Sequence, residues 1–182
     1  MKKMILKAVG ATFFSVVILL FVILLGVSLL FPSFMARTTA QLGWYSAASH
    51  YAVMEYDRTG EIEDIADAFE YAVFSERDED IVSCAQRYVG HDSFKEDCKQ
   101  PQYVYGQLAV SLYRVGDAQG AIETAFGASP NYTAGCAIKY LCVEVASAMD
   151  KETGSILYEK LSAIGTDAPT EYARMLSILK HI

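Results

Sequence analysis

Basic side chains are scarce in this 182-residue sequence, which has 15 Lys and Arg against 22 Asp and Glu and a formal charge of −7. All 22 acidic residues lie beyond residue 36, together with only 12 of the basic ones, so that part carries a net charge of −10. A nucleic-acid-binding domain needs a basic surface to meet the phosphates. The charge distribution therefore argues against a nucleic-acid partner.

The sequence also lacks the motifs of the common enzyme classes. It contains no glycine-rich phosphate loop, Walker motif, HExxH or GxSxG. Its four cysteines have neither CxxC spacing nor a histidine at ligand spacing. We therefore expect a protein that is not an enzyme, with no catalytic residue, metal or cofactor. A remote alternative is a thiol-dependent enzyme that uses Cys84 or Cys98 with His91 as the base.

Proline is rare, and no stretch alternates between apolar and polar residues for long, as a strand would. Apolar residues recur at helical spacing instead, and each such helix must bury its apolar face against a neighbour. The pattern predicts an all-α fold, with residues 91–100 forming either one short helix or an ordered loop. The helices are expected at 34–57, 61–74, 78–89, 101–115, 117–127, 132–149, 152–164 and 168–180.

Charged residues are absent from the 29 consecutive residues 8–36. Within this run, residues 13–31 are almost all Phe, Val, Ile and Leu, and about 20 such residues cross a bilayer core as a helix. We predict a transmembrane helix over residues 8–31, ended by Pro32, which lacks a backbone donor and disfavours a helical residue before it. Ala11 and Ser15 form a small-residue pair at which another membrane helix could pack.

Positive charge flanks this segment unevenly. Lys2, Lys3 and Lys7 precede it, whereas Arg37 is the only basic residue close to its end. The positive-inside tendency predicts that residues 1–7 are cytoplasmic and residues 32–182 extracytoplasmic. The apolar run exceeds the roughly 7–15 residues of a cleaved signal, so we expect an uncleaved signal anchor, with cleavage as the alternative.

All four cysteines follow the predicted span and therefore lie in the compartment where disulfides form. Cys84 and Cys98 flank the ambiguous segment, and a disulfide between them would close a loop of about 15 residues. Cys136 and Cys142 share the predicted helix 132–149 and lie about 9 Å apart along its axis, too far for a disulfide. Buried free thiols and cross-pairs between the two sets are the alternatives.

Residues 105–125 read YGQLAVSLYRVGDAQGAIETA, with large, small and glycine positions at regular offsets. Their spacing resembles that of the tetratricopeptide repeat over about residues 105–130, and a fainter unit covers residues 51–72. The second helix departs from the family because it ends early at Ser129 and Pro130. The resemblance implies a stack of helical hairpins that binds a protein or peptide on a concave face. The matching positions are Tyr105, Leu108, Ala109, Leu112, Gly116 and Ala121.

Tyrosine is abundant, with 12 residues, and it is favoured at protein interfaces. Because the sequence combines amphipathic helical hairpins with a membrane anchor and has no catalytic constellation, we predict a membrane-anchored extracytoplasmic scaffold or adaptor whose partner is another membrane or envelope protein. The alternative is an accessory subunit of a membrane complex, in which the transmembrane helix makes the specific contacts. The tyrosines predicted to form the partner-binding surface are Tyr51, Tyr56, Tyr71, Tyr105 and Tyr113.

Overall fold

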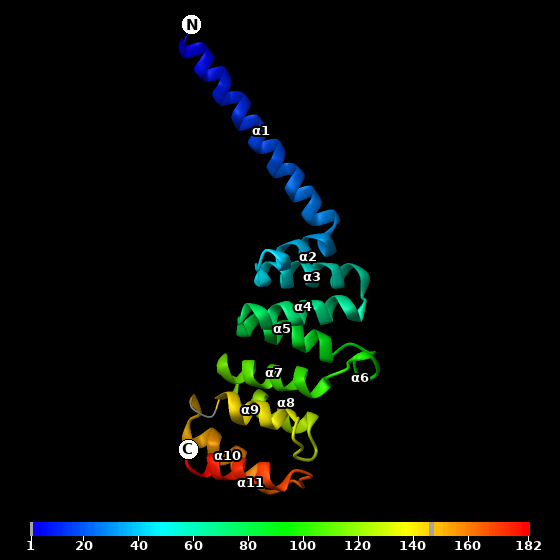
Figure 1. Cartoon of the computed structure of the whole chain (residues 1–182), viewed down its shortest axis with the longest axis vertical. Coiled ribbons are helices and arrows are strands. Elements are labelled where there is room, and N and C mark those ends of the chain that lie inside the picture. The colour runs from blue at the N-terminus through cyan, green and yellow to red at the C-terminus, as the bar shows by residue number, and fades with distance from the viewer. Residues whose placement is uncertain (1, 146–147) are drawn as a thin grey trace.

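A computed structural model describes residues 2–145 and 148–182, with side chains from residue 12 onward. The described residues form eleven helices and no strand, so the predicted all-α class is confirmed. The first helix, α1 (Lys2–Leu30), projects alone from one end of a stack formed by the other helices (Figure 1). Its large apolar side chains are exposed from Phe13 to Leu25 and at Leu29 and Leu30, and residues Thr12–Leu30 are long and apolar enough to cross a membrane.

Pro32 separates α1 from the stack. Phe31 leaves the helical conformation, and Pro32 opens α2 (Pro32–Gln41) at the first helical position, where a missing backbone donor costs nothing. The predicted end of the apolar helix at Pro32 is therefore confirmed. Only the last turn of α1 touches the stack, where Ser28 becomes buried.

The predicted single helix over residues 34–57 is wrong. The chain forms α2 and α3 (Tyr45–Thr59) instead, and these two helices pack against each other. Gly43 adopts a left-handed conformation with φ +76°, its amide donates to Ala40, and the amide of Trp44 donates to the Thr39 carbonyl. This glycine cap terminates α2 and reverses the chain.

The middle of the chain follows the predicted pattern closely. Glycines with positive φ, Gly60 and Gly116, close α3 and the seventh helix and allow the chain to turn back. Consecutive helices pack side by side into layers of paired helices (Figure 1). The four predicted helices here are confirmed within one or two residues. They are α4 (Ile62–Ser75), α5 (Asp78–Val89), α7 (Pro101–Arg114) and α8 (Ala118–Ala128).

The ambiguous segment 91–100 contains a single short helix, α6 (Phe94–Asp97). Phe94 is buried between Tyr88 and Tyr105, with ring centroids at 5.0 and 5.6 Å. One aromatic anchor thus holds a segment that is too short to form a second full helix after α5.

The predicted helix 132–149 is wrong at its start. The helix α9 (Ala137–Val145) begins five residues later, because Tyr132 is held by contacts with residues further along the chain. The Tyr132 amide donates to the Gly165 carbonyl at 2.9 Å, and its buried ring packs against Tyr172. The last two helices, α10 (Lys151–Ser162) and α11 (Pro169–Lys180), lie close to their predicted ranges.

Candidate functional site

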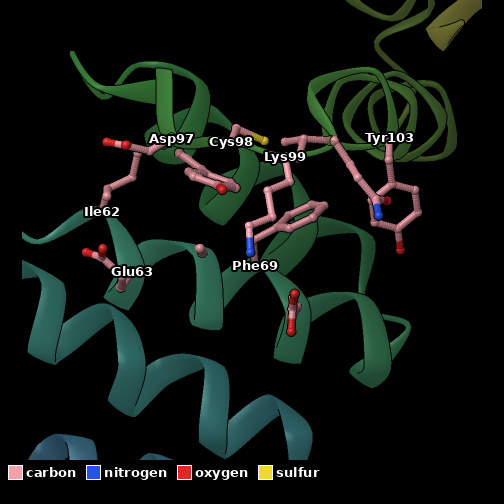
Figure 2. Close-up of a pocket in the computed structure, with 12 residues that line it drawn as sticks. Ile62, Glu63, Phe69, Asp97, Cys98, Lys99 and Tyr103 are labelled. Atoms are coloured by element: carbon pink, nitrogen blue, oxygen red, sulfur yellow. The ribbon is translucent and has the colours of Figure 1, made fainter. Parts of the chain in front are cut away.

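The shortness of α6 leaves an opening in the stack. α5 packs directly on α7, while α6 lies at the edge of the stack (Figure 1). A cavity of about 430 Å³ remains between α4 and α7, which we call the α4–α7 hollow. It is lined within residues 62–70 of α4, by Tyr88 of α5, by residues 97–100 and by Tyr103 and Val104 of α7 (Figure 2).

Aromatic rings form the inner wall of this hollow. The Phe69 ring lies 6.1 Å from both the Tyr88 and the Tyr103 rings, and Phe69 is buried. Burial, together with a hydrogen bond to Cys98, raises the pKa of Tyr88. Burial, followed by the nearby Tyr140 and Glu70, raises the pKa of Tyr103. Both phenols therefore stay neutral at physiological pH and can donate or accept hydrogen bonds.

Charged side chains surround the aromatic wall. Glu63, Glu70 and Asp97 face the hollow together with a single cation, Lys99, which Figure 2 shows directed toward Phe69. Three carboxylates against one ammonium give a local charge of −2. Within the described part of the chain, none of these four side chains forms an ion pair, so their charges are available to a ligand. The excess of carboxylates favours a cationic group.

A second concavity, the α3–α5 groove, runs between residues 46–57 of α3 and residues 77–87 at α5, with a volume of about 830 Å³. Its charges already pair with one another. Arg87 binds Asp57 at 2.7 Å, and Arg77 lies 3.5 Å from Asp80. The groove is therefore locally neutral, and the α4–α7 hollow is the better candidate for a site that recognises charge.

The five predicted tyrosines are all half-buried and pack against the core, and none lines the hollow or the groove. Tyr56 and Tyr105 both contact the α5–α6 segment, through His91 and Phe94 respectively. Tyr113 instead donates to the Ala148 carbonyl at 3.2 Å, near the start of α10. The surface formed by Tyr51, Tyr56, Tyr71, Tyr105 and Tyr113 stays a prediction.

Sequence reasoning missed the residues of the hollow. Phe69, Tyr88 and Tyr103 fit the apolar stripes of three separate helices, so each is expected in a core. The sequence contains one signal for this site: segment 91–100 is short, and the helices before it carry several acidic residues. It indicates a gap in the stack but does not identify which residues face it.

All four cysteines are free thiols in the structure. Cys84 is buried with its sulfur 3.4 Å from the Ser49 hydroxyl, and Cys98 is half-buried in the hollow, so the Cys84–Cys98 disulfide stays a prediction. Burial raises the pKa of the Cys84 thiol, and it raises that of Cys142 to about 12. Because Cys136 precedes α9 rather than lying within it, the helical argument against a Cys136–Cys142 pair does not apply.

His91 is held by the backbone rather than by a thiol. Its Nε2 donates to the Gly60 carbonyl at 3.1 Å, while its Nδ1 accepts from the Ser93 amide at 3.2 Å. The thiolate of Cys84 is disfavoured by burial. These contacts do not favour a His91–thiol pair. Among the described residues, no group of three or more His, Cys, Asp and Glu has the arrangement of a metal site.

The small-residue pair on α1 is described only in part. Ser15 is exposed on the helix, whereas the side chain of Ala11 lies outside the described residues. Packing of another membrane helix at this pair stays a prediction.

No protein family, curated protein or solved structure matches this chain. The structure shows a stack of paired helices, in which α7 and α8 form one hairpin. Leu108, Ala109 and Ala121, which carry the tetratricopeptide-like spacing, are buried within it.

Proposed function

We propose that this protein is a membrane-anchored extracytoplasmic scaffold or adaptor, built as a tetratricopeptide-like stack, that binds another membrane or envelope protein. α1 would serve as an uncleaved signal anchor with residues 1–7 in the cytoplasm. The observation that carries the proposal is the α4–α7 hollow, an open cavity with an aromatic wall and unpaired carboxylates. Among the described residues, no segment of the chain occupies this cavity.

The chemistry of the hollow suits a basic side chain of the partner. An ammonium or guanidinium group gains from the face of an aromatic ring such as the half-buried Tyr103. It also gains charge-assisted hydrogen bonds from Glu63, Glu70 or Asp97. We therefore expect a Lys or Arg of the partner to enter the hollow, with the acidic surface accelerating the encounter.

Anchoring supports this function physically. A domain tied to the bilayer meets membrane partners at a high effective concentration, so a modest intrinsic affinity suffices. A small site with few polar contacts is consistent with such an arrangement.

Photo-crosslinking in native membranes tests the proposal. A photoreactive residue at Gln100, in the hollow, is expected to crosslink a membrane or envelope protein, and Glu70→Lys is expected to reduce the yield about tenfold or more, which corresponds to about 1.4 kcal/mol. Glu159→Lys is the matched control, because it reverses the same charge on the exposed surface of α10. A yield that Glu70→Lys leaves unchanged, or no protein crosslink at all, would contradict the proposal.

The accessory-subunit alternative is favoured by one observation, the exposure of the large apolar side chains of α1 from Phe13 to Leu25. Exchange of residues 8–31 for an unrelated apolar helix separates the two functions. A crosslink at Gln100 that persists after the exchange supports the adaptor. A crosslink that disappears while the protein stays in the membrane supports the accessory subunit.

A further inference from the structure

Large exposed apolar side chains gather at the end of the stack that meets α1. Phe34, Leu42, Trp44 and Phe74 are exposed to 60, 59, 63 and 64%, and we call them the proximal patch. Exposed large apolar residues elsewhere in the described stack lie at the end of α7, on α9 and on α10. They are Val115, Val143, Ile156 and Tyr158.

The orientation of α2 brings part of this patch to the base of α1. α2 buries Pro32, Ala36 and Thr39 against the stack and exposes Phe34 and Arg37 on its outer side. Figure 1 shows that α2 crosses beneath the lower end of α1 instead of continuing its direction. A membrane surface perpendicular to α1 at its lower end would therefore run along the outer side of α2.

The rest of the patch lies at the same edge. The α2–α3 turn and the end of α4 meet at the left of Figure 1, on the side toward which α1 leans. Trp44 and Phe74 line one shallow depression of about 340 Å³, and the Phe74 ring lies 5.2 Å from that of Tyr45. Because α1 leans to the left, a membrane surface perpendicular to it slopes down toward this left edge. It therefore meets the α2–α3 turn and the end of α4 as well as α2.

The turn that presents Trp44 is well defined by hydrogen bonds. The Trp44 amide donates to the Thr39 carbonyl, and its own carbonyl accepts from the amide of Ala48, so the residue belongs to both helices. Gly43, with positive φ, completes the α2 cap. Leu42 and Trp44 are thus held outward by backbone geometry.

We propose that the proximal patch lies in the interface of the bilayer that α1 crosses, so that the stack rests on the lipid surface. Phe34, Leu42, Trp44 and Phe74 would sit at the level of the headgroups, where aromatic rings are favoured. Lipid is the occupant because only Phe31 separates α1 from α2, which keeps the patch at the membrane surface. The inference rests on the proposed membrane span.

Trp44 makes the test direct, since it is the only tryptophan in the chain. The full chain is reconstituted in phosphatidylcholine vesicles whose acyl chains carry bromine, which quenches nearby indole fluorescence. We expect strong quenching by the brominated lipid and weak quenching by aqueous iodide. The result does not depend on the orientation of insertion, because the patch stays beside the leaflet at the end of α1.

A second reporter separates this inference from the span itself. In a Trp44→Phe background, Leu20→Trp places the indole in the middle of Thr12–Leu30. Quenching of both reporters supports the inference. Quenching of Leu20→Trp with an unquenched, iodide-accessible Trp44 overturns the lipid contact and leaves the span intact. If neither reporter is quenched, the span and the inference both fail.

Surface variants complete the test. Phe34→Ser with Phe74→Ser is expected to lower quenching of Trp44 by brominated lipid about twofold, because half of the apolar contact is lost. Val143→Ser, an exposed apolar residue on α9, should leave it unchanged, with far-UV circular dichroism confirming the fold of both variants. If Trp44 is shielded from iodide without being quenched by brominated lipid, a second protein copy covers the patch and the inference is overturned.

Discussion

Gly106 is a residue at which one methyl group decides whether two helices can pack. A Cβ at this position of α7 would lie 2.6, 2.7 and 2.8 Å from Cδ2, Cγ and Cβ of Tyr140 in α9. These atoms are close to the α9 backbone, and the Tyr140 ring also packs on Tyr103 at 5.9 Å. The side chain therefore cannot move aside without disturbing the crossing of α7 and α9.

We expect Gly106→Ala to destabilise the stack. Overpacking costs about 1–3 kcal/mol, which exceeds the gain of about 1 kcal/mol in helix propensity. Thermal unfolding of the full chain in detergent, followed by circular dichroism, should show a lower midpoint, by about 2–4 °C per kcal/mol for a domain of this size.

Gly127 provides the matched control, because it is exposed on α8 and a Cβ there would meet nothing within 4 Å. Gly127→Ala should raise the midpoint, since only the propensity term operates. Equal midpoints for Gly106→Ala and the wild type would mean that α7 and α9 can separate freely.

Spacing within one segment predicts burial but not close contacts between segments. Leu108, Ala109 and Ala121 occupy the apolar positions of the repeat-like pattern, and all three are buried as that pattern implies. The need for glycine at position 106 is different, because it depends on Tyr140 in a helix further along the chain. Helical periodicity carries no information about which side chain of another helix lies opposite.

At the level of elements, Asp150 shows how one side chain begins a helix and joins it to another. Its Oδ1 accepts from the Thr153 amide at 2.9 Å, which caps α10, and Tyr113 of α7 donates to the Ala148 carbonyl beside it. Hydrogen bonds from the Thr153 hydroxyl, and then from its amide, lower the pKa of Asp150. The ionised carboxylate is therefore favoured in the folded state.

The consequence is a pH-dependent contribution to stability. Because the folded pKa lies below the ordinary value of about 3.9, the contribution is full above that pH and disappears as the pH falls through the folded pKa. We expect the wild type to unfold at a higher temperature than Asp150→Asn at pH 7, with the difference closing below about pH 4. Thermal unfolding at a series of pH values measures this difference.

Asp92→Asn removes the same charge at an exposed position and serves as the control. Its difference from the wild type should be smaller at pH 7. A gap for Asp150→Asn that is the same at pH 3 and pH 7 would show that the carboxylate charge contributes nothing.

Helices with a clear local stop are predictable from the sequence, and helices ended by long-range contacts are not. Gly60 and Gly116 follow complete apolar stripes, so the ends of α3 and α7 are predicted well. Gly43 interrupts a run whose apolar spacing continues on both sides. The sequence therefore predicts one helix where the structure has two. The late start of α9 depends on the pairing of Tyr132 with Gly165, and no pattern near Tyr132 reveals that partner.

The candidate site illustrates the same limit on a larger scale. The sequence leaves segment 91–100 open between one short helix and an ordered loop, and the structure shows the short helix α6. The α4–α7 hollow follows only once α5 is known to pack directly on α7. Neither its aromatic wall nor its unpaired carboxylates can be assigned before the stacking order is known.

For the whole molecule, the distribution of charge sets the orientation that we expect. Lys2, Lys3 and Lys7 lie on one side of the apolar helix, and a domain with a net charge of −10 lies on the other. Retention of lysines in the cytoplasm during insertion favours export of the opposite end. The hollow and its proposed partner would then be on the far side of the membrane.

Cysteine labelling in intact cells with a membrane-impermeant maleimide tests this orientation. Cys98→Ser removes the half-buried native thiol, and the other three cysteines are buried. In that background, Glu159→Cys, on the exposed surface of α10, should react in intact cells, because the stack lies outside the membrane. Lys3→Cys should react only after the cells are opened. If the two results are reversed, the stack lies in the cytoplasm, because the two ends of a single membrane-spanning helix are on opposite sides of the membrane.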